Sequence, residues 1–384
     1  MATAKRIALV TETWPPEVNG VAMTTERMVA GLAGHHQVEL VRVRQSRDDA
    51  PAPKASYQSL LMPGIGLPRY QGLHLGLPMT GRLIRHWRTQ RPDLVHVVTE
   101  GPLGWSAMRA AQRLKIPLSS DFHTNFHHYS DHYGTKLLAR PVLGYLRGLH
   151  NRTRATLVPT RELAEELGGQ GFTRLRVVSR GVDTRLFHPR QRSRMRRRQW
   201  GIQGDDTPVL LMVSRVAAEK NFSLAIRAFR EVEKVVPWAR MVIVGDGPQR
   251  ERLAADNPDI IFAGMLRGVS LAEHYASADI FVFPSLSETF GNVTLEAMAS
   301  GLPTVAYNYA AAREHIRHGD NGLLAERDDE AGLIAQVLRL AQSQAMRSKL
   351  GAAARRTAEG LGWGQICGDF EQALLAVLEE DGDE

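Results

Sequence analysis

The segment from Pro284 to Glu296 carries two carboxylates in a setting that suits a ligand rich in hydroxyl groups. A buried apolar run ends at Pro284, a loop with Glu288 and Gly291 follows, and a helical pattern begins at Asn292. The free N–H groups and positive dipole end of a helix start suit a diphosphate. Carboxylates accept hydrogen bonds from hydroxyl pairs, so Glu288 and Glu296 can both bind a sugar. The alternative is a helix-terminal charge on Glu288 and a solvated Glu296.

Two cations, Arg215 and Lys220, follow the apolar run Val209–Ser214. Cations at the carboxyl end of a strand suit two phosphates, with Arg215 as a bidentate fork and Lys220 as a point charge. Their charge would stabilise a leaving diphosphate, a task that a divalent metal performs elsewhere. A surface Arg and Lys near a helix start is the alternative. No metal site is expected, because the lone Asp-x-Asp, Asp381–Asp383, lies in an acidic tail.

Glycines occupy two further strand ends. Gly245 opens the sequence Gly-Asp-Gly-Pro after an apolar run, where it permits either close approach of a ligand or a plain tight turn. Gly20 lies between the first expected strand and the first expected helix. A glycine there can bring backbone amides close to the phosphates of a bound donor or to an acceptor molecule.

His123 emerges from a strand end, and His127 and His128 follow it closely. An imidazole in that position can bond a sugar hydroxyl or the acceptor, and its pKa range suits proton transfer. A structural role is the alternative for each of the three. By position, His123 is the best candidate.

Short apolar runs alternate with amphipathic stretches along the whole chain, which is typical of parallel sheets covered by helices. Expected helices include 23–32, 224–235, 292–299 and 364–378. Expected strands are 6–11, 37–43, 94–98, 117–122, 156–159 and 175–179 in the first half, and 209–214, 240–245, 260–263, 280–284 and 304–307 in the second.

The strand series restarts after Pro189, so we expect an α/β protein of two Rossmann-like domains facing each other across a cleft. The boundaries would be 1–189 for the first domain and 190–363 for the second, followed by a C-terminal helix and an acidic tail at 364–384. A cleft between two such halves is a preferred ligand site.

Composition narrows the function classes. The single cysteine, Cys367, excludes an internal disulfide framework and any multi-cysteine metal site. The apolar run near the N-terminus is too short for a signal peptide, and no run is long enough to span a membrane. We therefore expect a cytoplasmic protein.

Charge divides unevenly between the halves. Residues 1–190 hold 26 Lys+Arg against 14 Asp+Glu, whereas residues 191–384 hold 22 against 27. This asymmetry favours an anionic partner for the first half, either a membrane surface or nucleic acid. Arg82, Arg85, Trp87 and Arg88 would form a basic amphipathic helix able to rest on an anionic bilayer, although a solvated helix face is the alternative. The basic run 190–198 raises a nucleic-acid-binding alternative, but no nucleic-acid-binding motif accompanies it.

Taken in order, these segments resemble family 4 of the retaining glycosyltransferases, which have the GT-B fold. The resemblance covers nearly the whole chain and includes Gly181–Pro189 and Ala299–Ala306. It departs in detail at Asn19, Ser214 and the pair Ala310 and Ala311, where glycines are common in the family.

The resemblance implies that residues 1–189 bind the acceptor, that residues 190–363 bind the nucleotide sugar, and that the C-terminal helix of 364–384 crosses back to the first domain. It also implies a role for each matching residue. Arg215 and Lys220 would hold the donor diphosphate, Glu288 the sugar hydroxyls and Glu296 the ribose. His123 would bond the sugar near its reacting carbon. The remaining donor contacts would come from backbone at Gly20, Gly245, Met265, Leu266, Phe290, Gly291, Asn292 and Val293.

The resemblance also implies the chemistry. The anomeric configuration would be retained, with the leaving phosphate taking the acceptor's proton and with no metal or other cofactor. The 121–133 stretch is similar to glycolipid-forming members that transfer mannose, glucose or sulfoquinovose. We therefore expect transfer of a hexose from a GDP- or UDP-sugar to a membrane lipid such as diacylglycerol or a phospholipid headgroup, by an enzyme peripheral to the inner face of the membrane. A soluble sugar acceptor and a GT-B epimerase are the alternatives.

Overall fold

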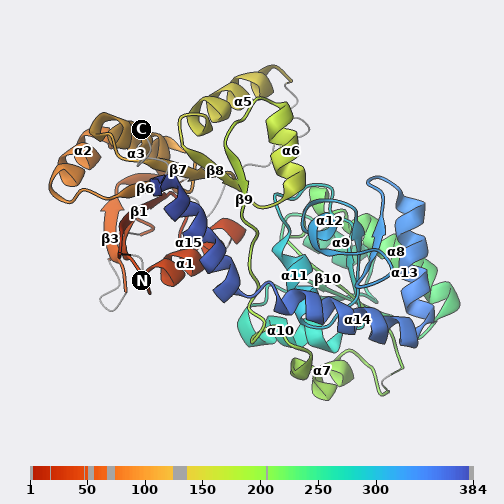
Figure 1. Cartoon of the computed structure of the whole chain (residues 1–384). Helices are drawn as coiled ribbons and strands as arrows, with labels where there is room; N and C mark the ends of the chain where they lie inside the picture. The colour runs from red at the N-terminus through yellow and green to blue at the C-terminus, as the bar shows by residue number, and fades with distance from the viewer. Residues whose placement is uncertain are drawn as a thin grey trace. The chain divides into compact units, whose positions relative to one another are not determined.

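The chain folds into two compact units, each containing its own parallel sheet (Figure 1). The computed structural model describes residues 3–17, 19–46, 48–50, 56–66, 74–123, 136–204 and 206–379, with residues 136–139 described by their backbone alone. Unit 1 comprises Met1–Arg180 with Trp363–Glu384, and unit 2 comprises Gly181–Gly362.

The change of unit comes at Arg180, earlier than the break after Pro189 that the sequence suggested. Val182 donates its N–H to the carbonyl of Leu361, and Phe187 is buried in a core of unit 2. These contacts place the segment 181–189 with the second unit.

Unit 1 has a parallel sheet whose described strands run in the order β3-β2-β1-β6-β7-β8-β9. Ala8 and Val10 of β1 face one apolar core, while Ile7 and Leu9 face another, as expected for a strand covered on both sides. The strands are β1 (Arg6–Thr11), β2 (Gln37–Val43), β3 (Gln58–Met62), β6 (Leu94–Val97), β7 (Leu118–Asp121), β8 (Ala155–Val158) and β9 (Leu175–Val177), with a separate antiparallel pair β4 (Gly64–Gly66) and β5 (His74–Gly76).

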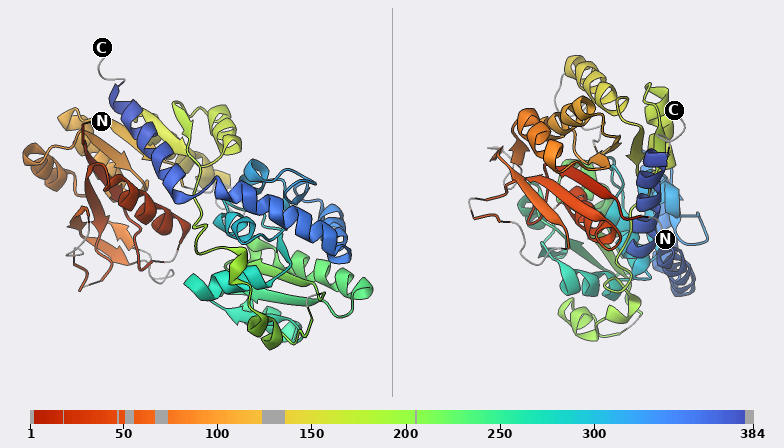
Figure 2. Two further views of the ribbon diagram at one scale, coloured as in Figure 1. Left: turned by 60° about the horizontal axis from the view of Figure 1, so that its bottom comes forward. Right: turned by 60° about the vertical axis from the view of Figure 1, so that its left-hand side comes forward.

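The last helix of the chain packs on unit 1. Phe370 and Leu374 of α15 share the core of Ile7 and Leu9, and Figures 1 and 2 show this blue helix alongside the red α1. Glu371 bonds the imidazoles of His35 and His36, at 2.9 and 3.1 Å, which fastens α15 to the segment before β2. The described helices of unit 1 are α1 (Gly20–Leu32), α2 (Thr80–Thr89), α3 (Pro102–Leu114), α5 (Lys136–His150), α6 (Arg161–Gly169) and α15 (Trp363–Glu379).

Unit 2 has a parallel sheet whose described strands run in the order β12-β11-β10-β13-β14-β15. The chain builds outward from β10 first through β11 and β12, then on the other side through β13, β14 and β15. The switch point of this sheet therefore lies between β10 and β13, where open α/β sheets bind ligands. The strands are β10 (Val209–Val213), β11 (Arg240–Val244), β12 (Ile261–Gly264), β13 (Ile280–Phe283), β14 (Thr304–Tyr307) and β15 (Leu323–Ala325).

Helices cover both faces of this sheet. Leu210 and Met212 of β10 point into one apolar core, and Val209, Leu211 and Val213 into the other. The helices of unit 2 are α7 (Arg194–Gln199), α8 (Phe222–Val235), α9 (Arg250–Asp256), α10 (Gly268–Ser277), α11 (Asn292–Ala299), α12 (Ala310–His315), α13 (Glu330–Gln342) and α14 (Gln344–Glu359), with the 3-10 turns η1 (Pro189–Gln191) and η2 (Ala218–Lys220).

Candidate functional site

Lys220 and Glu288 meet at the switch point of unit 2. Lys220 ends η2, after β10, and Glu288 lies in the loop after β13. The Lys220 Nζ lies 2.5 Å from Glu288 Oε1 and also donates to the carbonyl of Ser287 at 2.9 Å. Ser285 Oγ donates to the same carboxylate oxygen at 2.7 Å. A cation and a carboxylate, each held by a second group, are thus presented together at the carboxyl edge of the sheet.

Arg215 stands at the same edge and is the more exposed of the two cations. Its guanidinium pairs with Glu219, and 56% of its side chain is accessible, against 14% for Lys220. The main chain of Glu219 accepts a hydrogen bond from Leu286 N at 3.0 Å, so the loops after β10 and β13 are joined directly. Glu219 itself is buried, so the pair is exposed only on the arginine side, and the accessible part of the guanidinium is open to a second anion.

Gly245 allows the loop after β11 to lie against the loop after β10. Its φ is +139°, and a Cβ at this position would lie 1.8 Å from the carbonyl oxygen of Ser214. Its N–H is donated to Gly264 O at 2.8 Å. The glycine is therefore required by backbone packing between loops, whatever ligand approaches them.

The helix α11 begins beside Glu288. Gly291, its N-cap, has a φ of +92°. Phe290 is buried, Val293 is half-buried, and the Oδ1 of Asn292 is buried with no hydrogen-bond partner among the described residues. This helix start therefore contains a polar atom that a hydroxyl or amide donor could satisfy.

Glu296 faces the phenol of Tyr275 rather than a cation. Burial raises the pKa of Glu296 to about 7, while the hydrogen bond that Tyr275 Oη donates to its Oε2, at 2.9 Å, works in the opposite direction. Desolvation favours the neutral acid, and one phenol does not compensate. The carboxyl group is therefore poised to titrate near neutrality.

Met265 and Leu266 connect β12 to α10 at the same edge of the sheet. Met265 is one of the exposed large apolar side chains, while Leu266 packs against a core of unit 2. All the donor-binding residues expected in the second half are thus gathered along one edge of one sheet. His123 and Gly20 lie in unit 1, where His123 follows β7 and Gly20 begins α1.

His123 sits at the end of a chain of side chains in unit 1. Its Nδ1 lies 3.1 Å from Arg180 Nη2, and its Nε2 lies 3.3 Å from Asp121 Oδ2. The guanidinium can only donate, so Nδ1 accepts, and the proton of a neutral ring is on Nε2, facing Asp121. On the other side of Asp121, Oδ1 lies 3.3 Å from Nε2 of the buried His96.

The imidazoles on either side of Asp121 govern its charge. Burial opposes its ionisation, but His96 and His123 outweigh that effect and hold the pKa of the carboxyl well below its usual range. The Nδ1 of His123 accepts a hydrogen bond from Arg180, while its Nε2 faces the Asp121 carboxylate at 3.3 Å.

Trp87 is not a membrane-facing residue. It is fully buried in a core of unit 1, and its Nε1 donates to Glu39 Oε2 at 2.9 Å, which corrects the expectation from the sequence. The period of α2 turns Leu83 and Trp87 inward together and leaves Arg82, Arg85 and Arg88 exposed. The helix therefore presents cations to solvent without an aromatic anchor.

Three of the six arginines in the basic run 190–198 bind carboxylates of unit 2, which weakens the reason for a nucleic-acid-binding function. Arg192 and Arg197 both pair with Asp279, at 2.9 and 2.7 Å, and Arg196 pairs with Glu273 at 2.8 Å. These bonds attach α7 to the end of α10 and the start of β13. A cation engaged in this way is not available to phosphates.

Other expectations fall outside what can be described. His127, His128 and the segment 381–383 lie outside the described residues. Among the residues that are described, no group of three or more His, Cys, Asp or Glu side chains could hold a metal ion. The described helices also include none with the length and apolar content needed to cross a bilayer.

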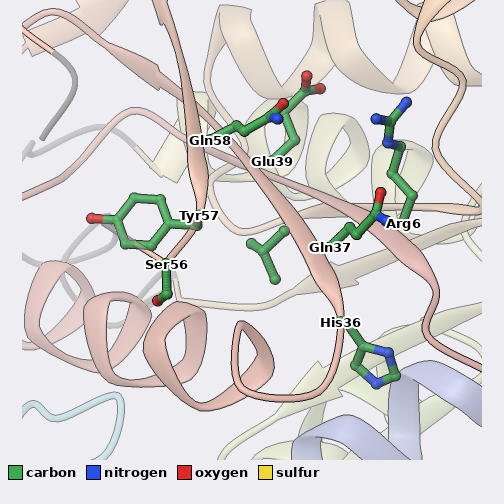
Figure 3. A pocket seen from close by; sticks show the side chains of 8 residues that line it. Arg6, His36, Gln37, Glu39, Ser56, Tyr57 and Gln58 are labelled. Carbon is green, nitrogen blue, oxygen red and sulfur yellow. The ribbon is translucent and has the colours of Figure 1, made fainter. Parts of the chain in front are cut away.

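A pocket of about 250 Å³ lies at the opposite, amino end of the strands of unit 1, where Arg6, Gln37 and Gln58 begin β1, β2 and β3. Figure 3 shows that its His36 and Glu39 leave the strand in opposite directions. His36 reaches Glu371, and Glu39 bonds His86 and Trp87. These two buried side chains of the pocket thus bind other parts of unit 1.

Family models match most of the chain. The model of Glycosyltransferase Family 4 matches residues 18–186, and that of Glycosyl transferases group 1 matches residues 207–343. A GDP-mannose-dependent alpha-mannosyltransferase of Mycolicibacterium smegmatis is 34% identical over 97% of this chain and 98% of its own length. The chain belongs to glycosyltransferase family 4. It is therefore an enzyme of the glycosyltransferase class.

Other members of the family show its range. The sulfoquinovosyl transferase SQD2 of Arabidopsis thaliana is 33% identical to this glycosyltransferase over 77% of the chain, which spans 59% of the plant protein. The alpha-monoglucosyldiacylglycerol synthase of Streptococcus pneumoniae is 28% identical over 79% of the chain and 71% of its own length.

The fold is GT-B, as solved structures show. Sucrose-phosphate synthase from Thermosynechococcus elongatus aligns with a TM-score of 0.78 and 18% identity over 98% of this chain and all of its own. The Anabaena protein HepE, solved with UDP and glucose, aligns with a TM-score of 0.74 and 18% identity over 97% of this chain and all of its own. At such identities the likeness concerns the fold alone.

Several groups that surround the expected site residues of this glycosyltransferase were not predicted from the sequence. Asp121, directly before Phe122 and His123, could have been recognised from the sequence as a carboxylate at a strand end. Tyr275 could not be recognised, because in sequence a tyrosine on the apolar side of a helix looks the same as a core residue. Side chains that reach across a sheet from distant segments leave no local pattern.

Proposed function

We propose that this family 4 enzyme transfers a hexose from a nucleotide-sugar donor to a membrane lipid, with retention of configuration and without a divalent metal. The observation that carries the proposal is the pairing of Lys220 with Glu288 at the switch point of unit 2. A GT-B sheet that places a cation and a carboxylate side by side there has one group for a phosphate and one for a sugar hydroxyl.

In this proposal, unit 2 binds the donor. Arg215 and Lys220 hold the diphosphate, Glu288 accepts hydrogen bonds from the transferred sugar, and Glu296 accepts one from the ribose. The Oδ1 of Asn292, which lacks a partner among the described residues, accepts a further donor group. The names of relatives favour GDP-mannose, and HepE, solved in complex with UDP-glucose, is an example of a UDP-sugar bound to the same fold.

The transfer then needs no nucleophile from the protein. The acceptor oxygen forms the new bond to the anomeric carbon on the face that the leaving diphosphate vacates. The electron pair of the broken carbon–oxygen bond goes to the diphosphate, which takes the proton of the acceptor hydroxyl. Arg215 and Lys220 stabilise the charge that develops on the diphosphate, as fixed cations do at pre-organised sites.

A lipid acceptor is supported by charge as well as by relatives. Arg82, Arg85 and Arg88 of α2 are exposed, as are Arg109 and Arg113 of α3, which packs against α2. Neither helix contains an acidic residue. Such a face suits an anionic leaflet. A monoglucosyldiacylglycerol synthase and a sulfoquinovosyl transferase are among the relatives.

The test is release of nucleoside diphosphate from UDP-, GDP- and ADP-sugars, with and without anionic liposomes that contain diacylglycerol, and with EDTA or magnesium in parallel. We expect one donor to be used, with release that rises with liposomes and is indifferent to EDTA. Product analysis should show the α-linked glycolipid when the donor sugar is α-linked.

Each other outcome removes one part of the proposal. Release that liposomes do not affect would indicate a soluble acceptor. Conversion of the donor sugar with no acceptor present would indicate an epimerase. Loss of activity with EDTA, restored by magnesium, would contradict the metal-independent mechanism.

A further inference from the structure

The loop that carries Glu288 is fixed mainly through its main-chain carbonyls. We call residues 284–291, between β13 and α11, the donor loop. Apart from the bond that Thr294 N donates to Gly291 as α11 begins, four of its carbonyl oxygens accept hydrogen bonds from groups outside it. These bonds run from Arg327 Nη2 to Leu286 at 2.9 Å, from Lys220 Nζ to Ser287 at 2.9 Å, from Tyr309 Oη to Glu288 at 2.7 Å, and from Ala311 N to Phe290 at 2.8 Å.

These bonds come from opposite sides of the loop. Lys220 belongs to the loop after β10, on one side of β13, whereas Tyr309 follows β14 on the other side. Arg327 comes from beyond β15, the next strand outward. In Figure 1, α11 and α12 lie close together at this edge, consistent with their contacts.

Tyr309 and Arg327 also support each other. The guanidinium carbon of Arg327 lies 5.0 Å from the centroid of the Tyr309 ring, within the range of a cation–π contact. One side chain therefore braces the other while each holds a different carbonyl of the donor loop. The arrangement involves two residues outside the segments that pointed to donor binding.

The bonds on the two sides of the donor loop should respond differently when a donor binds. If Lys220 binds the diphosphate, it is drawn toward a new partner, and its bonds to Ser287 and Glu288 are exchanged. The bonds from Tyr309 and Arg327 involve no donor-binding group and can persist. The outer side must then hold the donor loop while Glu288 engages the sugar, since small displacements of a binding group have large effects on rate.

We propose that Tyr309 and Arg327 are positioning residues, which act through the donor loop to aim Glu288 at the transferred sugar. This inference rests on the proposed function. It predicts that the pair governs recognition of the sugar more than recognition of the nucleoside diphosphate. A residue needed only for folding would not distinguish the two ligands.

The main test is Tyr309→Phe, which removes the hydroxyl and keeps the ring. Tyr307→Phe is the matched control, because the Tyr307 hydroxyl is buried with no hydrogen-bond partner among the described residues. For the nucleotide sugar that the wild type uses, we expect Tyr309→Phe to lower kcat/KM by about five- to tenfold, the effect of one hydrogen bond. Inhibition by the matching nucleoside diphosphate should change less than twofold. Arg327→Gln should act in the same direction, and Arg327→Lys should recover part of the loss.

A second measurement needs no ligand. Amide hydrogen exchange of peptides covering 286–293 should be faster in Tyr309→Phe than in the wild type, and unchanged in Tyr307→Phe. Unchanged exchange in Tyr309→Phe would overturn the inference, as would an equal loss of affinity for the nucleoside diphosphate and the nucleotide sugar. If the wild type used no donor at all, the proposed function would fail, while the exchange experiment would still decide whether Tyr309 holds the loop.

Discussion

The ammonium of Lys220 and the carboxylate of Glu288 lie 2.5 Å apart, although 68 residues separate them in the chain. They meet because β10 and β13 are neighbours in the sheet and both loops leave from its carboxyl edge. Each charge is neutralised by the other while no donor is bound. We expect a donor to exchange this pair for two new ones, with its diphosphate on Lys220 and its sugar hydroxyls on Glu288.

Replacement of Lys220 should therefore damage catalysis far more than folding. Lys220→Gln removes a positive charge aimed at the leaving diphosphate, and we expect kcat/KM to fall by roughly 100-fold. Lys234→Gln is the matched control, because Lys234 is an exposed lysine paired with Glu231 in α8. Nucleoside diphosphate release and thermal unfolding, measured on both variants, separate the two effects. An activity within threefold of the wild type in Lys220→Gln would remove Lys220 from the site.

Donor affinity should depend on pH through Glu296. Burial raises the pKa of this carboxyl group to about 7, so it is mostly protonated at pH 6 and mostly ionised at pH 8. An ionised carboxylate accepts hydrogen bonds from ribose hydroxyls more strongly than the neutral acid. The KM for the donor should therefore fall as pH rises from 6 to 8, by about fivefold for a difference of roughly 1 kcal/mol.

Two variants test the assignment to Glu296. Glu296→Gln cannot ionise, so its donor KM should be flat over the same range. Tyr275→Phe removes the hydrogen bond that lowers the pKa of Glu296, so the midpoint should move to higher pH. A pH dependence that survives in Glu296→Gln would have to come from another group.

The exposed arginines of α2 should control binding to anionic vesicles. Each cation near such a surface contributes about 1 kcal/mol, so the triple change of Arg82, Arg85 and Arg88 to Gln should weaken binding on the order of 100-fold. The control removes the same charge from unit 2, at the exposed Arg190, Arg194 and Arg198. Sedimentation with phosphatidylglycerol vesicles would compare the two. Equal losses of vesicle binding in the two triple variants would mean that binding depends on net charge alone and not on the arginines of α2.

The sequence located the strands of both sheets well because parallel strands are apolar on both sides. The expected strands 6–11, 37–43 and 304–307 have the bounds of β1, β2 and β14. The short edge strand β15 was missed, since three residues are too few to show a pattern. The strand β3 was also missed, because it is only half-buried and follows a stretch rich in alanine and proline.

Side-chain direction was harder to predict than position. The basic pattern of α2 was correct, but its Trp87 was expected to face a membrane and instead lies in the core. Local composition predicts an amphipathic helix but does not show what covers its apolar side. In the structure the indole N–H of Trp87 is bound by Glu39 of β2, a contact that local composition could not show. The same limit applies to the donor loop, whose support from Tyr309 and Arg327 arises only when four strands are assembled.

Ala310, directly after Tyr309, offers a test of backbone strain beside the donor loop. Its φ is +51°, in the left-handed region, which costs an alanine roughly 1–2 kcal/mol. Glycine avoids that cost but loses about 0.5–1 kcal/mol of conformational entropy, so Ala310→Gly should range from neutral to stabilising by about 1 kcal/mol.

The neighbouring Ala311 has ordinary helical geometry and is buried, so Ala311→Gly should destabilise by about 1 kcal/mol. The two variants should therefore differ in Tm by about 2–4 °C or more, with Ala310→Gly the higher. A lower Tm for Ala310→Gly would show that the left-handed backbone at Ala310 is not strained.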